Sequence, residues 1–142
     1  MQFYREQWYC NVILKARQLG FTTFIDLMGL DACLFTPDHF AGIIAHNLED
    51  AGKIFRRKIR YPYDNLPAEL RRAIPIVAGN TSELRFGNGS EMSVGTSMRS
   101  GTVQFLHVSE FGKICRKYPD KAEEIVTGAF QAVHAGQRIY VE

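Results

Sequence analysis

The hydrophobic pattern of the chain changes period several times, and each change marks an expected element. Short apolar runs, typical of buried strands, occupy residues 11–14, 41–45, 103–108 and 139–141. Longer apolar segments, or apolar residues spaced by three and four, predict helices over residues 22–35, 47–59, 67–73 and 118–134. Strands that alternate with helices predict a three-layer α/β domain, a mostly parallel sheet with helices on both faces.

Between residues 82 and 94 the period shortens to two. Polar and apolar residues alternate over 83–86 and again over 91–94, and Asn88 and Gly89 stand between the two runs. Asn-Gly between alternating runs is a strong signal for a β-hairpin. The pattern therefore predicts an antiparallel hairpin before the strand at 103–108.

Individual residues indicate where other elements begin and end. Asn47 is expected to cap the helix that follows it, and Gly136 is expected to end the last helix. Two prolines in or near residues 61–65 predict a turn or irregular segment there. Residues 2–9 mix aromatic and polar side chains, which is consistent with a short helix anchored in the core by Trp8 and its aromatic neighbour.

Composition is that of an ordinary globular protein. The 142 residues suffice for one domain, 1–142, with a core of its own. Apolar residues make up 46% of the chain and charged residues 23%, as in most soluble domains. Lysine and arginine (17) exceed aspartate and glutamate (15) by only two, so any contact with nucleic acid must come from local clusters of charge.

The cysteines and the apolar runs indicate the compartment. Cys10, Cys33 and Cys115 are an odd number without metal-type spacing, so reduced intracellular thiols are expected. No run reaches the roughly 18 to 20 uninterrupted apolar residues of a membrane helix, because Asp26 and Asp31 interrupt the best candidate. The N-terminus lacks the apolar core of a signal sequence. We therefore expect a cytoplasmic protein without a membrane partner.

The densest group of basic residues falls on and just after the helix expected at 47–59. The group lies opposite the apolar positions and comprises Lys53, Arg56, Arg57, Lys58 and Arg60. A basic helix face can follow a phosphate backbone, whereas a run of charge on one face is more often only solvated. The sequence leaves both interpretations open.

Residues 15–23, Lys-Ala-Arg-Gln-Leu-Gly-Phe-Thr-Thr, stand between an expected strand and an expected helix. A basic turn with a glycine can bind phosphate in that place, because N–H groups at the helix start point at the anion and the helix dipole favours negative charge. The hydroxyl of Thr22 can reach a magnesium ion. The alternative is an ordinary strand-to-helix connection in which Gly20 only turns the chain.

The loop departs from the usual phosphate-loop pattern G-x-x-x-x-G-K-[ST] at two positions. Phe21 occupies the lysine position, and Lys15 occupies that of the first glycine. The lysine has thus moved to the start of the loop, where its side chain can lie back across the phosphates. This arrangement resembles the deviant Walker A motif of tailed-phage terminase large subunits, the ATPases that pump DNA into a preformed capsid. The resemblance implies nucleotide contacts from Lys15, Gln18, Gly20, Thr22 and Thr23.

A second signal follows the strand at 103–108, which ends in Ser109-Glu110. An acid at the carboxyl end of such a strand is where an ATPase holds magnesium and polarises the attacking water. The terminase motif is commonly Asp-Glu here, so the resemblance implies Glu110 as catalytic base and Ser109 in place of the aspartate. A hydroxyl brings no charge, so the implied magnesium site, Thr22 with Ser109, is expected to be weak. The alternative for Glu110 is a surface carboxylate at a strand end.

Two arginines complete the implied site. Arg99 lies just before the strand at 103–108 and is followed closely by a glycine, as in the terminase pattern, where such an arginine can reach a neighbouring subunit's nucleotide. Arg17, inside the loop, is the candidate for the same role within its own subunit. Both would stabilise charge on the transferring phosphoryl group. Both can instead be structural arginines in salt bridges.

The resemblance covers nearly the whole chain and implies a P-loop ATPase of the additional-strand catalytic-glutamate type. It implies ATP and Mg²⁺ as cofactors, a homo-oligomeric ring as the working form, and double-stranded DNA, a portal protein and a small terminase subunit as partners. The coupling motif, the last strands and the nuclease domain of such an enzyme would follow residue 142. We therefore expect an incomplete ATPase domain with weak or absent turnover and no nuclease activity. The alternatives are an inert remnant or interaction module, and a helicase-like translocase with the same core.

Overall fold

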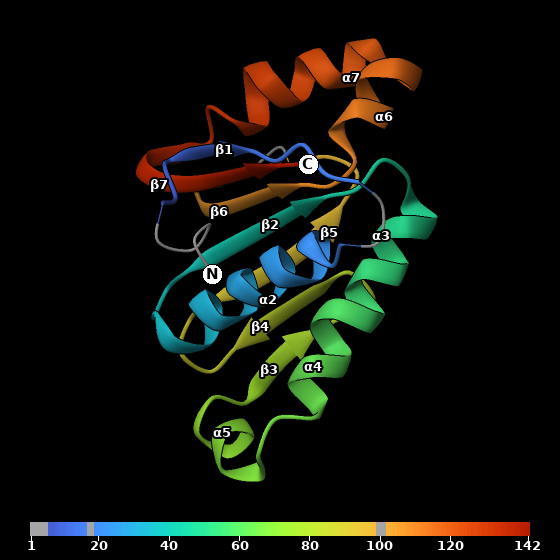
Figure 1. The fold of residues 1–142 in the computed structure, drawn as a ribbon. Coiled ribbons are helices and arrows are strands. Elements are labelled where there is room, and N and C mark those ends of the chain that lie inside the picture. Colours follow the sequence, from blue (N-terminus) through green and yellow to red (C-terminus); the bar gives the residue numbers. More distant parts are fainter. Residues whose placement is uncertain (1–5, 17–18, 99–101) are drawn as a thin grey trace.

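A mixed sheet of seven strands lies at the centre of the described part of the chain, residues 6–16, 19–98 and 102–142 of the computed structural model (Figure 1). The strands are β1 Cys10–Val12, β2 Phe40–Ile44, β3 Ile76–Gly79, β4 Glu83–Phe86, β5 Glu91–Gly95, β6 Val103–Val108 and β7 Val133–Val141. Their order across the sheet is β1-β7-β6-β2-β5-β4-β3. The neighbours from β1 to β5 run parallel, and β4 is antiparallel to both β5 and β3.

Helices cover both faces of this sheet. The first face carries α2 (Phe21–Phe35) and a long helix made of α3 (Leu48–Ile54), the π-helical segment η1 (Phe55–Arg60) and α4 (Tyr61–Asp64). The second face carries α6 (Phe111–Lys117), α7 (Pro119–Glu124) and the π-helical segment η2 (Ile125–Ala129). The short helix α5 (Ala68–Ala73) lies beyond β3, at the end of the molecule away from α6 and α7 (Figure 1).

Alternate residues of the central strands pack on opposite faces. In β2, Ile43 joins the core under α2, and Ile44 joins the core under α6 and α7. In β6, Phe105 and Leu106 divide in the same way. Strands that are buried on both faces need apolar residues at every position, which explains the unbroken apolar runs in the sequence. The predicted α/β architecture, a mostly parallel sheet between helices, is confirmed.

Several elements form where the sequence predicts them. The segment expected as a strand at 103–108 is β6, and the helix expected at 22–35 is α2. The predicted hairpin is β4 with β5, and its turn contains Gly89 with a φ of 84°. The carboxamide Oδ1 of Asn47 accepts the N–H of Asp50 at 2.8 Å and so caps α3 as expected.

The helix that starts with α3 is longer than predicted. We expected a turn over residues 61–65, but the helix continues through Asp64. The N–H of Tyr61 bonds to the carbonyl of Arg56, five residues earlier, so the chain enters α4 with a changed hydrogen-bond pattern. Pro62 donates no N–H, so the continuous helix lacks one backbone hydrogen bond at the start of α4.

The prediction for the C-terminal third was wrong in two respects. The helix expected at 118–134 ends with η2 at Ala129, and β7 already begins at Val133. Gly136 therefore caps no helix, because it lies inside β7 with a φ of 86°. Val133 pairs with Val103 of β6, and this distant partner, which the local helical spacing does not reveal, draws the segment into the sheet. Helix α6 and strand β3 were not predicted.

The N-terminal prediction was also wrong where it can be checked. Residues 6–9, the described part of the expected helix at 2–9, contain no helix. Trp8 and Tyr9 are 71% and 60% exposed, so neither anchors the core. Local bonds hold this segment instead, since the carboxamide of Asn11 accepts the N–H of Trp8 and donates to its carbonyl.

No helix in the described residues has the length and apolarity to cross a bilayer. A membrane-spanning helix needs about 20 mainly apolar residues. The most apolar long helix expected from the sequence, α2, has 15 residues and buries a charged residue, Asp26.

Candidate functional site

The carboxyl ends of four parallel strands, β1, β7, β6 and β2, meet at one edge of the sheet. Ligands of open α/β sheets bind outside this edge, because the loops there are free to carry polar groups. The loop after β1 brings Lys15 to it, the start of α2 brings Thr22, and β6 and β7 end in Ser109 and Glu142. Residues distant in the sequence thus form one polar cluster.

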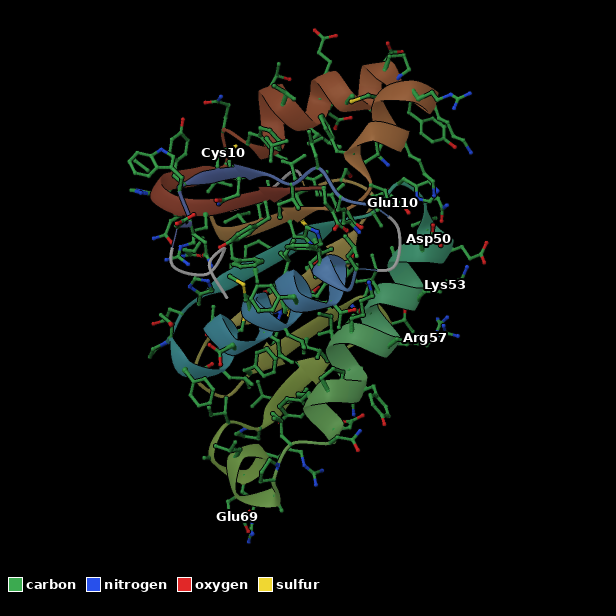
Figure 2. All side chains as sticks on the ribbon, in the orientation of Figure 1. Cys10, Asp50, Lys53, Arg57, Glu69 and Glu110 are labelled. Carbon is green, nitrogen blue, oxygen red and sulfur yellow. The ribbon has the colours of Figure 1, made fainter. Side chains whose placement is uncertain are left out.

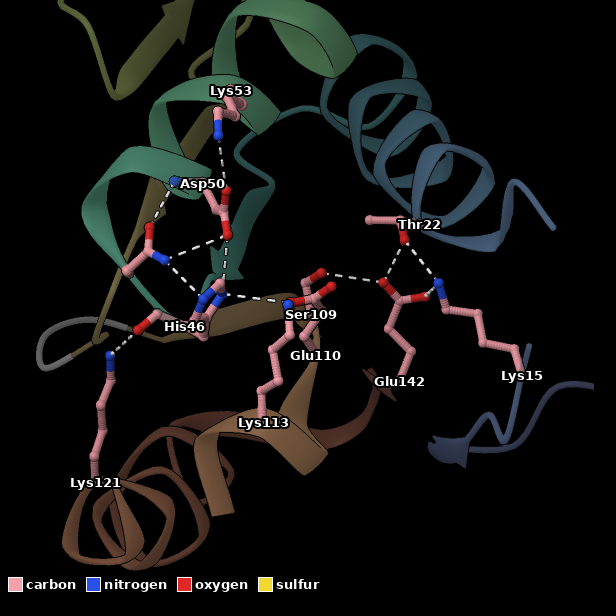
Figure 3. Close-up of polar contacts among 11 residues, drawn as sticks. Lys15, Thr22, His46, Asp50, Lys53, Ser109, Glu110, Lys113, Lys121 and Glu142 are labelled. Carbon is pink, nitrogen blue, oxygen red and sulfur yellow. Dashed lines mark hydrogen bonds and ion pairs between the residues drawn. The ribbon is translucent and has the colours of Figure 1, made fainter. Parts of the chain in front are cut away.

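These four side chains are directly bonded (Figure 3). The ammonium Nζ of Lys15 lies 2.9 Å from Oε2 of Glu142 and donates to the hydroxyl of Thr22 at 3.1 Å. The Thr22 hydroxyl donates to Oε1 of Glu142, and the Ser109 hydroxyl donates to the same oxygen at 3.1 Å. The cluster joins a cation, two hydroxyls and a carboxylate around one point.

Glu142 is the centre of this cluster. Its side chain has no exposed surface. Burial by itself would raise the pKa of the carboxyl, but hydrogen bonds from His107, Thr22 and Lys15, together with the charge of His107, lower the pKa to about 2. The carboxylate is therefore ionised at neutral pH.

Two further buried side chains, His107 and Asp26, connect Glu142 to the interior of the protein. Nε2 of His107 is 3.6 Å from Oε1 of Glu142, and Nδ1 of His107 is 2.7 Å from Oδ1 of Asp26 on α2. Burial tends to lower the pKa of His107, but the two carboxylates outweigh it and raise the pKa to about 9. Asp26 also lies 3.9 Å from Nζ of Lys58. The imidazolium therefore links the cluster to the basic helix segment η1.

Gly20 and Thr23 flank Thr22 at the start of α2. Gly20 precedes the helix with a φ of 75°, a conformation that favours glycine, and its carbonyl accepts the N–H of Phe24. Among the described residues, no side-chain hydrogen bond caps the start of α2. Thr23 is exposed on the first turn. This local geometry is that expected of an anion-binding turn.

Glu110 lies at the turn between β6 and α6 and has a φ of 56°, in the left-handed region. Its side chain is 44% exposed. Its carboxylate receives a hydrogen bond from Lys113 and lies 3.4 Å from Nδ1 of His46, which also lies 3.1 Å from Asp50 (Figure 3). The carboxylate is thus held by neighbours outside the Glu142 cluster.

Two cavities flank the cluster, and Glu110 lines both. The first, of about 360 Å³, is also lined by Lys15 and Glu142. The second, of about 230 Å³, is also lined by Thr22, Ser109 and the basic residues Lys53, Arg57 and Lys58. Lys15 and Glu110 therefore both line the first cavity.

The basic helix face contains more internal pairing than the sequence suggested. Lys53 pairs with Glu49 and Asp50, and Arg60 pairs with Asp64. Arg56 and Arg57 have no ion pair with any residue that the structure describes. Figure 2 shows Arg57 on the same side of the molecule as Lys53, Asp50 and Glu110. Part of this face thus belongs to the wall of the second cavity rather than to a separate solvated surface.

Three of the implied site residues cannot be placed. Arg17, Gln18 and Arg99 lie outside the described residues. Of the others, Lys15, Thr22 and Ser109 are brought together in the cluster, and Glu110 is adjacent to it. Gly20 and Thr23 adjoin Thr22.

Sequence reasoning missed three buried residues of the site: Glu142, His107 and Asp26. A signal was present for two of them, because His107 and Asp26 are isolated polar residues in otherwise apolar segments. A polar group in such a position is buried and therefore needs a partner. Nothing local identifies the partner, since His107 and Asp26 are 81 positions apart.

A scan of protein-family models finds no match to the chain, and a search of curated proteins finds none.

Proposed function

We propose that this chain is the ATP-binding part of a DNA-translocating motor of the terminase type. One observation carries the proposal: Lys15, Thr22 and Ser109, which the sequence implied as phosphate and metal contacts, converge on one carboxylate at the carboxyl edge of a parallel sheet. A cation, hydroxyls and an acid are the groups that a magnesium-bound triphosphate requires.

The strand order supports the same proposal. β7 lies between β1, which precedes the loop, and β6, which carries Ser109 and Glu110. An additional strand at this place is what the additional-strand catalytic-glutamate class implies. A simple meander would instead have placed β1 beside β2, the next strand in the sequence.

Different residues serve nucleotide binding, metal binding and proton transfer in this proposal. Lys15 and the positive end of the α2 dipole hold the phosphates, and the Thr22 hydroxyl with Ser109 offers oxygen ligands that suit magnesium. A magnesium ion held by these oxygens would offset the charge of the phosphates. Glu110 accepts the proton of the attacking water at its carboxylate, and Lys113 and His46 hold that carboxylate in place. Arg17 and Arg99 retain their proposed roles toward the phosphoryl group.

The remainder of the proposal comes from the resemblance. In the working motor the energy of hydrolysis drives double-stranded DNA into a procapsid, in the host cytoplasm. The chain would act there in a homo-oligomeric ring, with a portal protein and a small terminase subunit as partners. Arg56, which lacks an ion pair among the described residues and does not line the second cavity, is the side chain of the basic face best able to contact DNA phosphates.

Titration with a fluorescent ATP analogue and Mg²⁺ tests the proposal. We expect saturable binding that weakens at least tenfold in Lys15→Ala and in Thr22→Ala, with Lys117→Ala, an exposed lysine on α6, as the matched control. Glu110→Gln should bind ATP but not turn it over. Absence of saturable binding at millimolar nucleotide would refute the proposal and favour an inert remnant.

A further inference from the structure

Glu142 makes more contacts than it would need as a counter-ion to Lys15. Lys15 alone would neutralise the carboxylate, yet Thr22 and Ser109 both donate to its Oε1. The two hydroxyls come from α2 and β6, which reach this edge independently. Three elements therefore fix the orientation of one fully buried carboxylate.

The ammonium of Lys15 occupies the place of a metal cation in this arrangement. Its Nζ lies between a hydroxyl oxygen of Thr22, at 3.1 Å, and Oε2 of Glu142, at 2.9 Å. Oε2 is buried and accepts no hydrogen bond within the described residues apart from this ion pair. A hydroxyl and a carboxylate oxygen around a positive charge are the donor set that magnesium prefers.

The geometry points to Glu142 as the acidic ligand of the magnesium site, with Thr22 as its hydroxyl partner and Lys15 as the group that the metal replaces. This inference rests on the proposed function and deepens it. Ser109 brings no charge to the end of β6, and the charge comes instead from the end of the neighbouring strand, β7. Ser109 then orients Glu142, and Lys15, once released, turns to the phosphates.

A rival acidic site lies nearby. Ligand atoms of His46, Asp50 and Glu110 lie within 4.8 Å of one another. Asp50 already pairs with Lys53, Glu110 already pairs with Lys113, and Glu110 is 44% exposed. Imidazole also suits transition metals better than magnesium. The charge-bearing ligand of the magnesium site is therefore assigned to Glu142.

The test measures metal and nucleotide separately, with ADP, so that no turnover is involved. Mn²⁺, as a spectroscopic substitute for Mg²⁺, is titrated into the ADP complex and followed by electron paramagnetic resonance. We expect Glu142→Gln to weaken Mn²⁺ binding at least tenfold. The same variant should bind ADP without metal as tightly as the wild type or several-fold more tightly, because Lys15 is freed. Glu123→Gln, an exposed change on α7, is the matched control and should alter neither value.

Each other outcome has a definite meaning. Unchanged Mn²⁺ affinity in Glu142→Gln, or a tenfold loss in Asp50→Asn instead, overturns the assignment and leaves the proposed function standing. Failure of the wild type to bind ADP at all, with or without metal, overturns the proposed function itself. If Glu142→Gln does not fold, Glu142→Asp is tested in its place. Its shorter side chain should weaken Mn²⁺ binding. Wild-type Mn²⁺ affinity in Glu142→Asp overturns the assignment.

Discussion

The imidazole of His107 and the carboxylate of Asp26 form a fully buried pair, with Nδ1 2.7 Å from Oδ1. The pair joins the central strand β6 to α2 beneath the candidate site. A buried ion pair leaves an uncompensated charge when one partner is removed. We therefore expect Asp26→Asn to lower the free energy of unfolding by about 3–5 kcal/mol, as measured by urea denaturation.

Asp31→Asn, an exposed change on the same helix, is the control for that measurement and should stay within about 0.5 kcal/mol of the wild type. The double variant Asp26→Asn/His107→Asn should be less destabilised than the sum of the single variants, because it leaves no unpaired charge. A loss below about 0.5 kcal/mol in Asp26→Asn would contradict a charged, coupled pair.

The same pair predicts how stability depends on pH. The pKa of His107 is about 9 in the folded protein against 6.5 for an ordinary histidine, so the folded state binds the proton more tightly. The resulting stabilisation is fully present below pH 6.5 and is lost as the pH rises through 9, with a total on the order of 3 kcal/mol. Urea unfolding at pH 6 to 10 should show this fall in the wild type and in His134→Asn, which changes an exposed histidine. If His107→Asn loses the same stability over this pH range, other groups cause the pH dependence.

The hairpin turn gives a sharp test of backbone conformation. Gly89 has a φ of 84°, which L side chains rarely adopt, and a Cβ there would collide with Oδ1 of Asp38. Gly89→Ala should therefore destabilise the protein by about 1–3 kcal/mol in thermal or urea unfolding. Gly128→Ala is the control, because its Cβ would meet no atom within 4 Å. Equal stability of the two variants would argue against a left-handed backbone conformation at residue 89.

The cysteines differ in reactivity because they differ in burial. Burial raises the pKa of the Cys33 thiol to about 12, whereas Cys115 is exposed. A thiol reagent at pH 8 should label Cys115 at once and Cys33 only as fast as the protein unfolds, because the thiolate is the reactive form. Mass spectrometry of digested samples distinguishes the sites. Rapid labelling of Cys33 under native conditions would show that α2 opens locally.

Substitutions of two neighbouring arginines on η1 distinguish a direct nucleotide contact from a general effect of positive charge. Arg57 lines the cavity that Thr22, Ser109 and Glu110 also line, and Arg56 does not. Arg57→Ala should weaken MgATP binding about tenfold, as expected for one charge-assisted hydrogen bond, and Arg56→Ala should change it less than about twofold. Fluorescent-nucleotide titration measures both. Equal losses in the two variants would indicate a diffuse electrostatic effect instead.

Features that depend on near neighbours could be predicted from the sequence. The apolar run of β6, the Asn-Gly turn before β5 and the cap at Asn47 were all readable, because each rests on a few adjacent residues. The start of α2 near Thr22 was readable for the same reason. The spacing of apolar residues gave a wrong prediction at Val133. Its helical pattern continues into a strand that pairs with β6.

Which residues meet at the site becomes visible only in the folded chain. Thr22 and Glu142 are 120 positions apart, and they touch because β7 pairs between β1 and β6. Strand order depends on pairing across the whole sheet and leaves no mark on the composition of a single strand. For that reason Glu142, a lone carboxylate after an apolar run, had no visible partner in the sequence and is the central residue of the folded site.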